Sequence, residues 1–332
     1  MVDRMIFKKL LSVLLVTLVC TKVSTIDVLT RDFCYSEHWC EPAAWEDTFF
    51  ECADSPSKYP SPVNLNPSFM ERDATLTPLE FVNFSSLQGG NWVLKNIRNT
   101  VALEFNVGMQ VKGASLPKDY ETIHATFHWG SYSNNGSEHT YNNRRYPMEM
   151  QIYSSVFGSG YADLNEALTN ESSSVLVMSV FVDIAYENNP LMETVVDGLH
   201  SIPFAGDQVA VTPFILEDFL PNNTDKYYQY QGALTYPDCM YKVEWIIFEE
   251  PIYISEGQYF SFYSQVYYNE IADETAKLLI NNFRPVHRLG NRIVRVSPNA
   301  TIPVESSTCG LSANIHLAVL LPSLVSVMVK LM

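Results

Sequence analysis

The residues 123–129 alternate so that polar side chains share one face of a predicted strand. His124, Thr126 and His128 point one way, and the apolar residues between them point the other. Imidazole is the common metal ligand among these groups. However, the rise of a strand places the α-carbons of His124 and His128 about 13 Å apart, which is too far for one ion without a bulge. The pair alone therefore does not predict a metal site.

A second alternating segment, 149–153, offers a different set of donors. Glu149, Gln151 and Tyr153 lie on one face of it. The neutral amide oxygen of Gln151 suits hard cations better than zinc. Two neighbouring strands of this kind would bring together a hydroxyl, an imidazole and an amide.

Short motifs in a fixed order make the chain similar to the α-carbonic anhydrase family over about Phe33–Val296. The stretch 125–130 (ATFHWG) resembles the family's His-x-His-Trp-Gly strand, and 136–140 (GSEHT) resembles its motif of the same letters. Further similar segments are 61–65 (SPVNL), 146–151 (YPMEMQ), 232–237 (GALTYP), 282–285 (NFRP) and 291–292 (NR). The resemblance implies a mainly β (α+β) fold: a single large, twisted, mostly antiparallel sheet with short flanking helices.

By this resemblance, the positions of the three zinc ligands hold Thr126, His128 and Gln151. A catalytic zinc takes three protein ligands and a water molecule, whose pKa it lowers to about 7. Each ligand contributes roughly 3 kcal/mol to zinc binding, so the loss of two should weaken affinity by about 10⁴-fold or more. We therefore expect no metal, no cofactor and no catalytic residues, and we interpret His128 as a hydrogen-bonded pocket histidine.

At other positions of the family's site, some residues match those of the family and others differ. Thr235 and Glu138 match a hydrogen-bonded pair that orients the zinc-bound hydroxide, and here we expect them to hold a loop to the sheet. Val101 stands where the family has its proton-shuttle histidine. Tyr236 replaces a threonine, and its ring should crowd the mouth of the site. Leu234 and Trp245 match the hydrophobic wall of the family's pocket, and His139 and Glu149 match residues that steady the ligands.

One helix is predicted from periodicity, over Ile271–Asn281. Its apolar residues Ile271, Ala276, Leu279 and Ile280 fall near one side.

Composition limits the kinds of partner. The 332 residues carry a formal net charge of −16, which disfavours nucleic acid and anionic lipid. No linker, internal repeat, phosphate-binding glycine loop or zinc-finger cysteine pair is present in the sequence.

Both ends of the chain carry targeting patterns. Residues 1–25 combine basic residues with a short apolar run, as in a signal peptide, and a membrane anchor is the alternative. Residues 305–332 combine small residues, a polar spacer and an apolar tail, as in a glycosylphosphatidylinositol (GPI) attachment signal with Ser306 or Ser307 as the modified residue. A single transmembrane helix is the alternative. The domain between them is 26–304.

Five sequons and four cysteines fit secretion. The sequon asparagines are Asn83, Asn135, Asn170, Asn222 and Asn299. Without Cys20 and Cys309, which lie in the terminal signals, four cysteines allow three connectivities. Membrane-bound relatives in the family place a cysteine like Cys239 near the Thr235 loop, with its partner near the amino terminus. The resemblance thus implies Cys52–Cys239 and leaves Cys34–Cys40 as a local bridge.

Three functions remain open. Silent relatives, including domains on receptor phosphatases, look like protein-recognition modules, so the resemblance implies a lipid-anchored surface protein. Its expected partner is an extracellular or cell-surface protein, and a glycan is the less favoured alternative. The alternative is a zinc-dependent carbonate dehydratase with unusual ligands. The third possibility is a structural protein of a matrix or coat, and the acidic composition of the chain is the only feature that suggests it.

Overall fold

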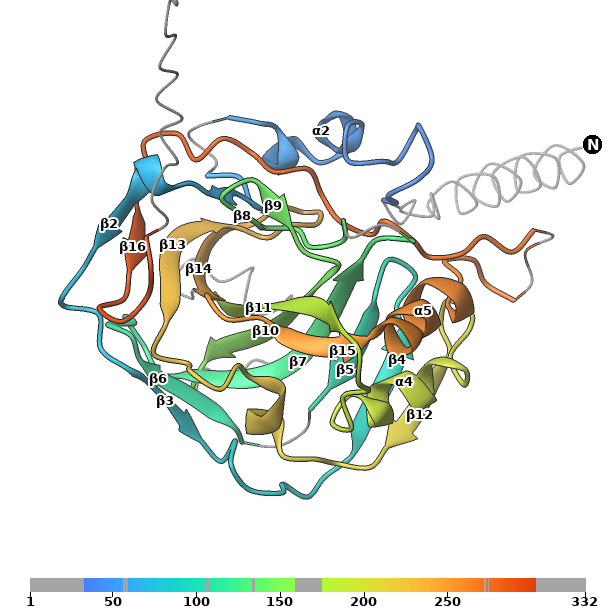
Figure 1. Ribbon diagram of the computed structural model, residues 1–332. Coiled ribbons are helices and arrows are strands. Elements are labelled where there is room, and N and C mark those ends of the chain that lie inside the picture. Colours follow the sequence, from blue (N-terminus) through green and yellow to red (C-terminus); the bar gives the residue numbers. More distant parts are fainter. Residues whose placement is uncertain are drawn as a thin grey trace, which may run out of the picture.

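A single large β-sheet organises the chain (Figure 1). The computed structural model describes residues 33–55, 59–105, 108–132, 135–158, 175–271, 273 and 275–302. The proposed signal peptide, the proposed lipid-anchor signal with Ser306 and Ser307, and Asn170 lie outside the described residues. Among the helices of the described part, none is long and apolar enough to cross a membrane.

Thirteen strands form the main sheet, and ten of them lie in the order β12-β4-β5-β7-β10-β11-β14-β13-β16-β2. Their bounds are β12 Gln208–Val211, β4 Trp92–Asn96, β5 Val101–Glu104, β7 Tyr120–Trp129, β10 Met148–Val156, β11 Val175–Ala185, β14 Tyr241–Phe248, β13 Tyr227–Ala233, β16 Val294–Val296 and β2 Met70–Arg72. β3 (Leu79–Val82) pairs with β6 (Gln110–Gly113), β6 pairs with β7, and β15 (Ile252–Ser255) pairs with β11. Within the main sheet, as far as the structure describes it, the parallel pairs are β11–β14, β11–β15 and β16–β2, so the mostly antiparallel sheet predicted from the resemblance is confirmed.

Small elements cover the sheet. A three-stranded sheet contains β1 (Asn64–Leu65), β8 (Thr140–Tyr141) and β9 (Arg144–Arg145). In the described part of the chain, the α-helices are α2 (Trp45–Thr48), α4 (Glu193–Leu199) and α5 (Glu256–Gln265), and the 3₁₀ turns are η1 (Phe50–Cys52), η3 (Pro67–Phe69) and η4 (Leu216–Phe219). Helices α4 and α5 pack on each other, next to β12 and β15 respectively (Figure 1).

The central strands are buried on both faces, which explains why their sequences are almost continuously apolar. In β11, for example, Leu176, Met178 and Val180 face one apolar layer, whereas Val177 and Phe181 face the other. The alternation of side chains thus divides the core into two layers on either side of one sheet.

The helix predicted over 271–281 is wrong. This segment runs back along the chain that follows α5, with Leu279 N donating to Val266 O and Tyr268 N donating to Lys277 O. The indole of Trp129 also donates to Leu279 O at 2.9 Å. These tertiary hydrogen bonds occupy the backbone groups that a helix would need. The helix of this region is α5, which Ser255 and Gln258 begin with a reciprocal capping box.

Both predicted disulfides are confirmed. Cys52–Cys239 joins residues 187 positions apart, and Cys34–Cys40 closes a loop of 6. The long bridge lies in a small apolar cluster with Trp45 and Phe49. The N-terminal segment is thereby tied to the loop that follows Thr235.

Candidate functional site

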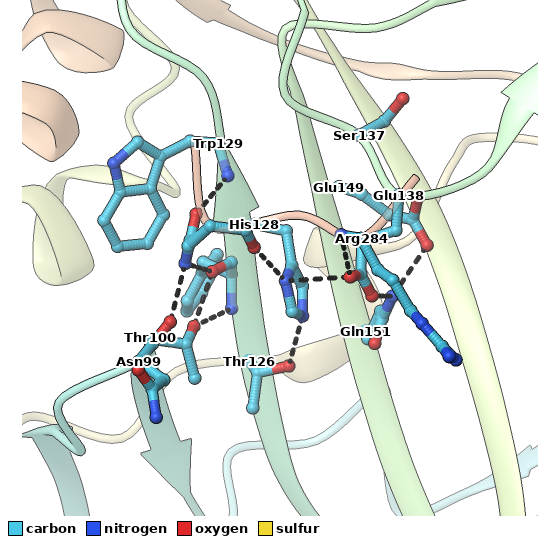
Figure 2. Close-up of polar contacts among 12 residues, drawn as sticks. Asn99, Thr100, Thr126, His128, Trp129, Ser137, Glu138, Glu149, Gln151 and Arg284 are labelled. Atoms are coloured by element: carbon cyan, nitrogen blue, oxygen red, sulfur yellow. Dashed lines mark hydrogen bonds and ion pairs between the residues drawn. The ribbon is translucent and has the colours of Figure 1, made fainter. Parts of the chain in front are cut away.

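The predicted site residues meet on one face of the sheet, at the pairing of β7 with β10. Gln151 lies directly opposite Thr126 in the antiparallel register, and Glu149 lies opposite His128. Residues opposite each other on neighbouring strands share a face, so the three predicted ligand positions do converge. Figure 2 shows them together with Glu138 and Arg284.

The tautomer of neutral His128 follows from its hydrogen bonds. Its Nδ1 lies 2.8 Å from Asn282 O, and because a carbonyl only accepts, Nδ1 carries the proton. Nε2 is then the acceptor, and the Thr126 hydroxyl donates to it at 3.3 Å. The two ligand positions on β7 are therefore bonded to each other.

Gln151 bridges two buried carboxylates. Its Nε2 donates to Glu138 Oε2 and to Glu149 Oε1, both at 2.9 Å. Its Oε1 accepts from the Tyr153 hydroxyl at 2.6 Å. Every polar atom of this amide thus has a protein partner.

Glu149 belongs to a buried charged network that extends across the strands. Its carboxylate accepts from the backbone N and from Nδ1 of His139, and from Ser179 Oγ. Burial opposes its ionisation, but the charge of His139 and these hydrogen bonds outweigh burial and lower its pKa to about 2. His139 Nε2 in turn lies 2.7 Å from the Tyr230 hydroxyl.

Glu138 reaches the network from the loop before β8. Its Oε1 accepts from the backbone N of Arg284 at 2.9 Å and lies 3.8 Å from His128 Nδ1. The loop can approach β7 and β10 only because residue 136 is glycine. A Cβ there would lie 1.9 Å from Pro147 O and 2.2 Å from Gly130 N.

The expected pair of Thr235 and Glu138 is not formed. Thr235 Oγ1 is buried without a hydrogen-bond partner, while both Glu138 oxygens are bonded elsewhere. The Thr235 hydroxyl therefore does not hold its loop to the sheet, whereas Glu138 does link the loop before β8 to Gln151 of β10. The Cys52–Cys239 bridge ties the loop after Thr235 to the N-terminal segment.

Val101 also departs from its expected place. It pairs with Phe127 rather than with Thr126, and its side chain is buried in the apolar layer on the other face of the sheet. Ala102, which lies opposite Thr126, occupies the polar face there. No proton-shuttle position is therefore filled by Val101.

Aromatic rings close the site from the N-terminal side. We call Phe33, Tyr35, Trp45 and Tyr236 the aromatic cover: Phe33 stacks on Tyr236 at 6.4 Å, and both Phe33 and Tyr35 contact Trp45 edge to face. The Tyr236 ring lies 6.2 Å from the ring of Tyr153, as expected for a residue that crowds the mouth.

The site is consequently closed to solvent. Thr126, His128 and Gln151 are 4 %, 2 % and 0 % exposed. Burial and the nearby Glu138 raise the pKa of the Tyr236 hydroxyl, so the ring stays neutral. In the described part of the chain, no group of three or more His, Cys, Asp or Glu residues is arranged to hold a metal ion.

His124 does not join His128. Its ring stacks on Tyr153 at 4.8 Å, and burial lowers its pKa to about 4. Leu234 and Trp245 lie in the apolar layer beside the network, as expected.

Several network members were not predicted as site residues. Ser179 could have been found from the alternation of β11, and Asn282 and Arg284 lie in the NFRP motif. Their partners come from distant parts of the chain, which no local pattern reveals.

Comparison with known proteins gives consistent matches. A family model for eukaryotic-type carbonic anhydrases matches residues 40–298. Carbonic anhydrase 4 of Rattus norvegicus is 28% identical over 298 residues, covering 84% of this chain and 94% of that protein. Carbonic anhydrase 12 of Homo sapiens is 31% identical over 250 residues, covering 72% and 69%. Receptor-type tyrosine-protein phosphatase zeta of Rattus norvegicus is 34% identical over 200 residues, which are 60% of this chain but only 8% of the phosphatase.

Proposed function

Because this chain belongs to the eukaryotic-type carbonic anhydrase family, we propose that it is a catalytically silent member and acts as a recognition module at the cell surface. The observation that carries the proposal is the hydrogen bonding of the three ligand positions. His128 Nε2 accepts from Thr126, and the Gln151 amide is held by Glu138, Glu149 and Tyr153.

The family's zinc does not fit these residues. Zinc needs three protein donors and an open position for water. This site supplies one imidazole, whose free nitrogen faces a hydroxyl, and side chains that are at most 4 % exposed. A metal ion would have to displace hydrogen bonds that are already made, without gaining nitrogen ligands.

Surface display rests on the two terminal signals, with the anchor at Ser306 or Ser307. The sequons support an extracellular location. Asn83, Asn135, Asn222 and Asn299, the four that the structure describes, are all exposed. The two disulfides also fit an oxidising compartment.

The partner we propose is an extracellular or cell-surface protein. The match to a domain-sized part of a receptor-type phosphatase supports this class, because that relative uses the same kind of domain as one small part of a receptor. The net charge of −16 disfavours nucleic acid as a partner.

Metal analysis tests whether the protein is catalytically silent. Protein purified from cells that express the full chain should contain far less than one zinc per chain after dialysis, and should not hydrate carbon dioxide above background. Zinc near one equivalent together with hydration would overturn the proposal and favour a carbonate dehydratase. Release from the cell surface by a phosphatidylinositol-specific phospholipase tests the anchor, and retention after treatment would favour a transmembrane helix.

A further inference from the structure

A recess of about 300 Å³ lies beside the aromatic cover, away from the polar network of the sheet. The N-terminal Cys34–Cys40 loop forms one wall, and the chain after α5 forms the other. The lining residues that carry the argument are Trp39, Arg98, Tyr268, Asn269, Asp273 and Lys277. Its volume is at the lower end of the range for small-ligand sites.

Trp39 is the feature that sets this recess apart. The chain has five tryptophans, and Trp39 is 70% exposed whereas the other four are at most 1 % exposed. The disulfide Cys34–Cys40 closes the six-residue loop that carries it. A broad apolar ring is thus held in water at the edge of a polar recess, where a ligand can cover it.

The two cations of the recess are already paired. Arg98 forms an ion pair with Glu270 at 2.8 Å, and the Lys277 ammonium is bonded to Glu37. Asp273 Oδ2 accepts from the backbone N of Glu270 at 3.1 Å. An anionic ligand would find no unneutralised cation here, and the whole chain repels it with a charge of −16.

The same pairs offer donors and acceptors side by side. Arg98 and Lys277 carry several N–H groups each, and the carboxylate of Asp273 has acceptor sites beyond its one backbone hydrogen bond. The Lys277 ammonium also lies 5.8 Å from the ring centroid of Tyr268. A ligand that matches this wall needs groups that both donate and accept, as hydroxyl groups do.

We propose that this recess binds a neutral pyranose sugar of an extracellular glycan. One face of such a ring carries C–H groups, which suit the negative face of the Trp39 indole, and its hydroxyl groups suit Arg98, Asp273 and Lys277. The inference goes beyond the recognition function proposed above and does not depend on the zinc content of the chain.

Tryptophan fluorescence tests the proposal directly, because only Trp39 among the tryptophans meets solvent. The mature protein, purified from cells that express the full chain, is titrated with methyl glycosides of glucose, galactose, mannose and N-acetylglucosamine. At least one should give a saturable blue shift at millimolar concentration. N-Acetylneuraminic acid, which is charged, should give none.

Matched variants separate binding from a change in fluorescence. Asp273→Ala keeps Trp39 and should weaken sugar binding by about tenfold or more, since it removes charge-assisted hydrogen bonds. Trp39→Phe should abolish the optical signal and weaken binding measured by saturation-transfer NMR. Tyr186→Ala, at a residue that is 99% exposed, should leave binding unchanged.

Three results would overturn the proposal: no saturable signal with any neutral glycoside, binding of the acidic sugar alone, or unchanged affinity in Asp273→Ala. Circular dichroism of each variant checks that the fold is intact. Zinc measured on the same preparation tests only whether the protein is catalytically silent, and sugar binding tests only the recess. Either proposal can therefore be contradicted while the other stands.

Discussion

Thr126 lies directly opposite Gln151 across the β7–β10 pair, in an unbroken part of the register. Both side chains are on the face that carries His128 (Figure 2). The register thus brings together the three positions at which the family resemblance implies zinc-binding histidines, and in this chain Thr126 and Gln151 fill two of them with hydrogen-bonding side chains.

Restoring the two histidines should create a zinc site. In Thr126→His with Gln151→His, three imidazoles would share one face of the sheet, and we expect zinc near one equivalent after dialysis. Hydration of carbon dioxide should remain slow, because the aromatic cover closes the site and Val101 lies on the opposite face. Adding His128→Ala to the double variant is the control, and it should remove the metal. A folded double variant that binds no zinc would show that the site has diverged beyond its two substituted positions.

Removing the buried charge of Glu149 should destabilise the domain strongly. Glu149→Gln breaks the pair with His139 and leaves that imidazole without its buried carboxylate. We expect a loss of about 3 kcal/mol in the free energy of unfolding, measured with urea. Ser179→Ala removes one hydrogen bond to the same carboxylate and should cost about 1 kcal/mol. Equal losses in the two variants would contradict this role for the charge.

Stability should fall as the pH drops from 6.5 towards 4. Burial lowers the pKa of His124 from 6.5 to about 4 in the folded state, so in this window the unfolded chain takes up a proton that the folded chain does not. His287 should add to the same loss of stability, since burial and the nearby Arg284 lower its pKa to about 4. The stability that these two histidines contribute is fully present above pH 6.5 and is lost progressively as the pH falls below it.

His124→Phe tests the share of His124 in this dependence. Phenylalanine can keep the stacking on Tyr153 but cannot take up a proton. Urea unfolding at several pH values should show a smaller slope between pH 6.5 and 4 than the unsubstituted protein. An unchanged slope would mean that His124 is not the group that titrates.

The two disulfides should differ in how much they stabilise the domain. The loop closed by Cys52–Cys239 spans 187 residues, and the chain-entropy model gives it about 5 kcal/mol. Cys34–Cys40 closes a loop of 6 residues and should contribute about 2 kcal/mol. Thermal unfolding of the variants Cys52→Ser with Cys239→Ser, and Cys34→Ser with Cys40→Ser, compares them. A larger loss from the short bridge would contradict the loop-length argument.

The sheet and the convergence of Thr126, His128 and Gln151 were predicted from the family resemblance that the ordered motifs carry. Strand alternation, which is a local property, added only that Thr126 and His128 share one face. The sequence did not predict the face of Val101, which depends on the register between β5 and β7. The helix over 271–281 failed because contacts with Val266 and Trp129 override a weak periodicity. α5 could have been found from Ser255 and Gln258, whose spacing is that of a capping box.

The last strand has a consequence for how the protein is made. β16 completes the sheet between β13 and β2, so one of the first strands of the domain has no partner until Val294–Val296 has been synthesised. The sheet can therefore be completed only after Val294–Val296 has been synthesised, and folding should be slow because many of its contacts join distant residues. A chain truncated before β16 would expose two unpaired strand edges, which invite aggregation during secretion.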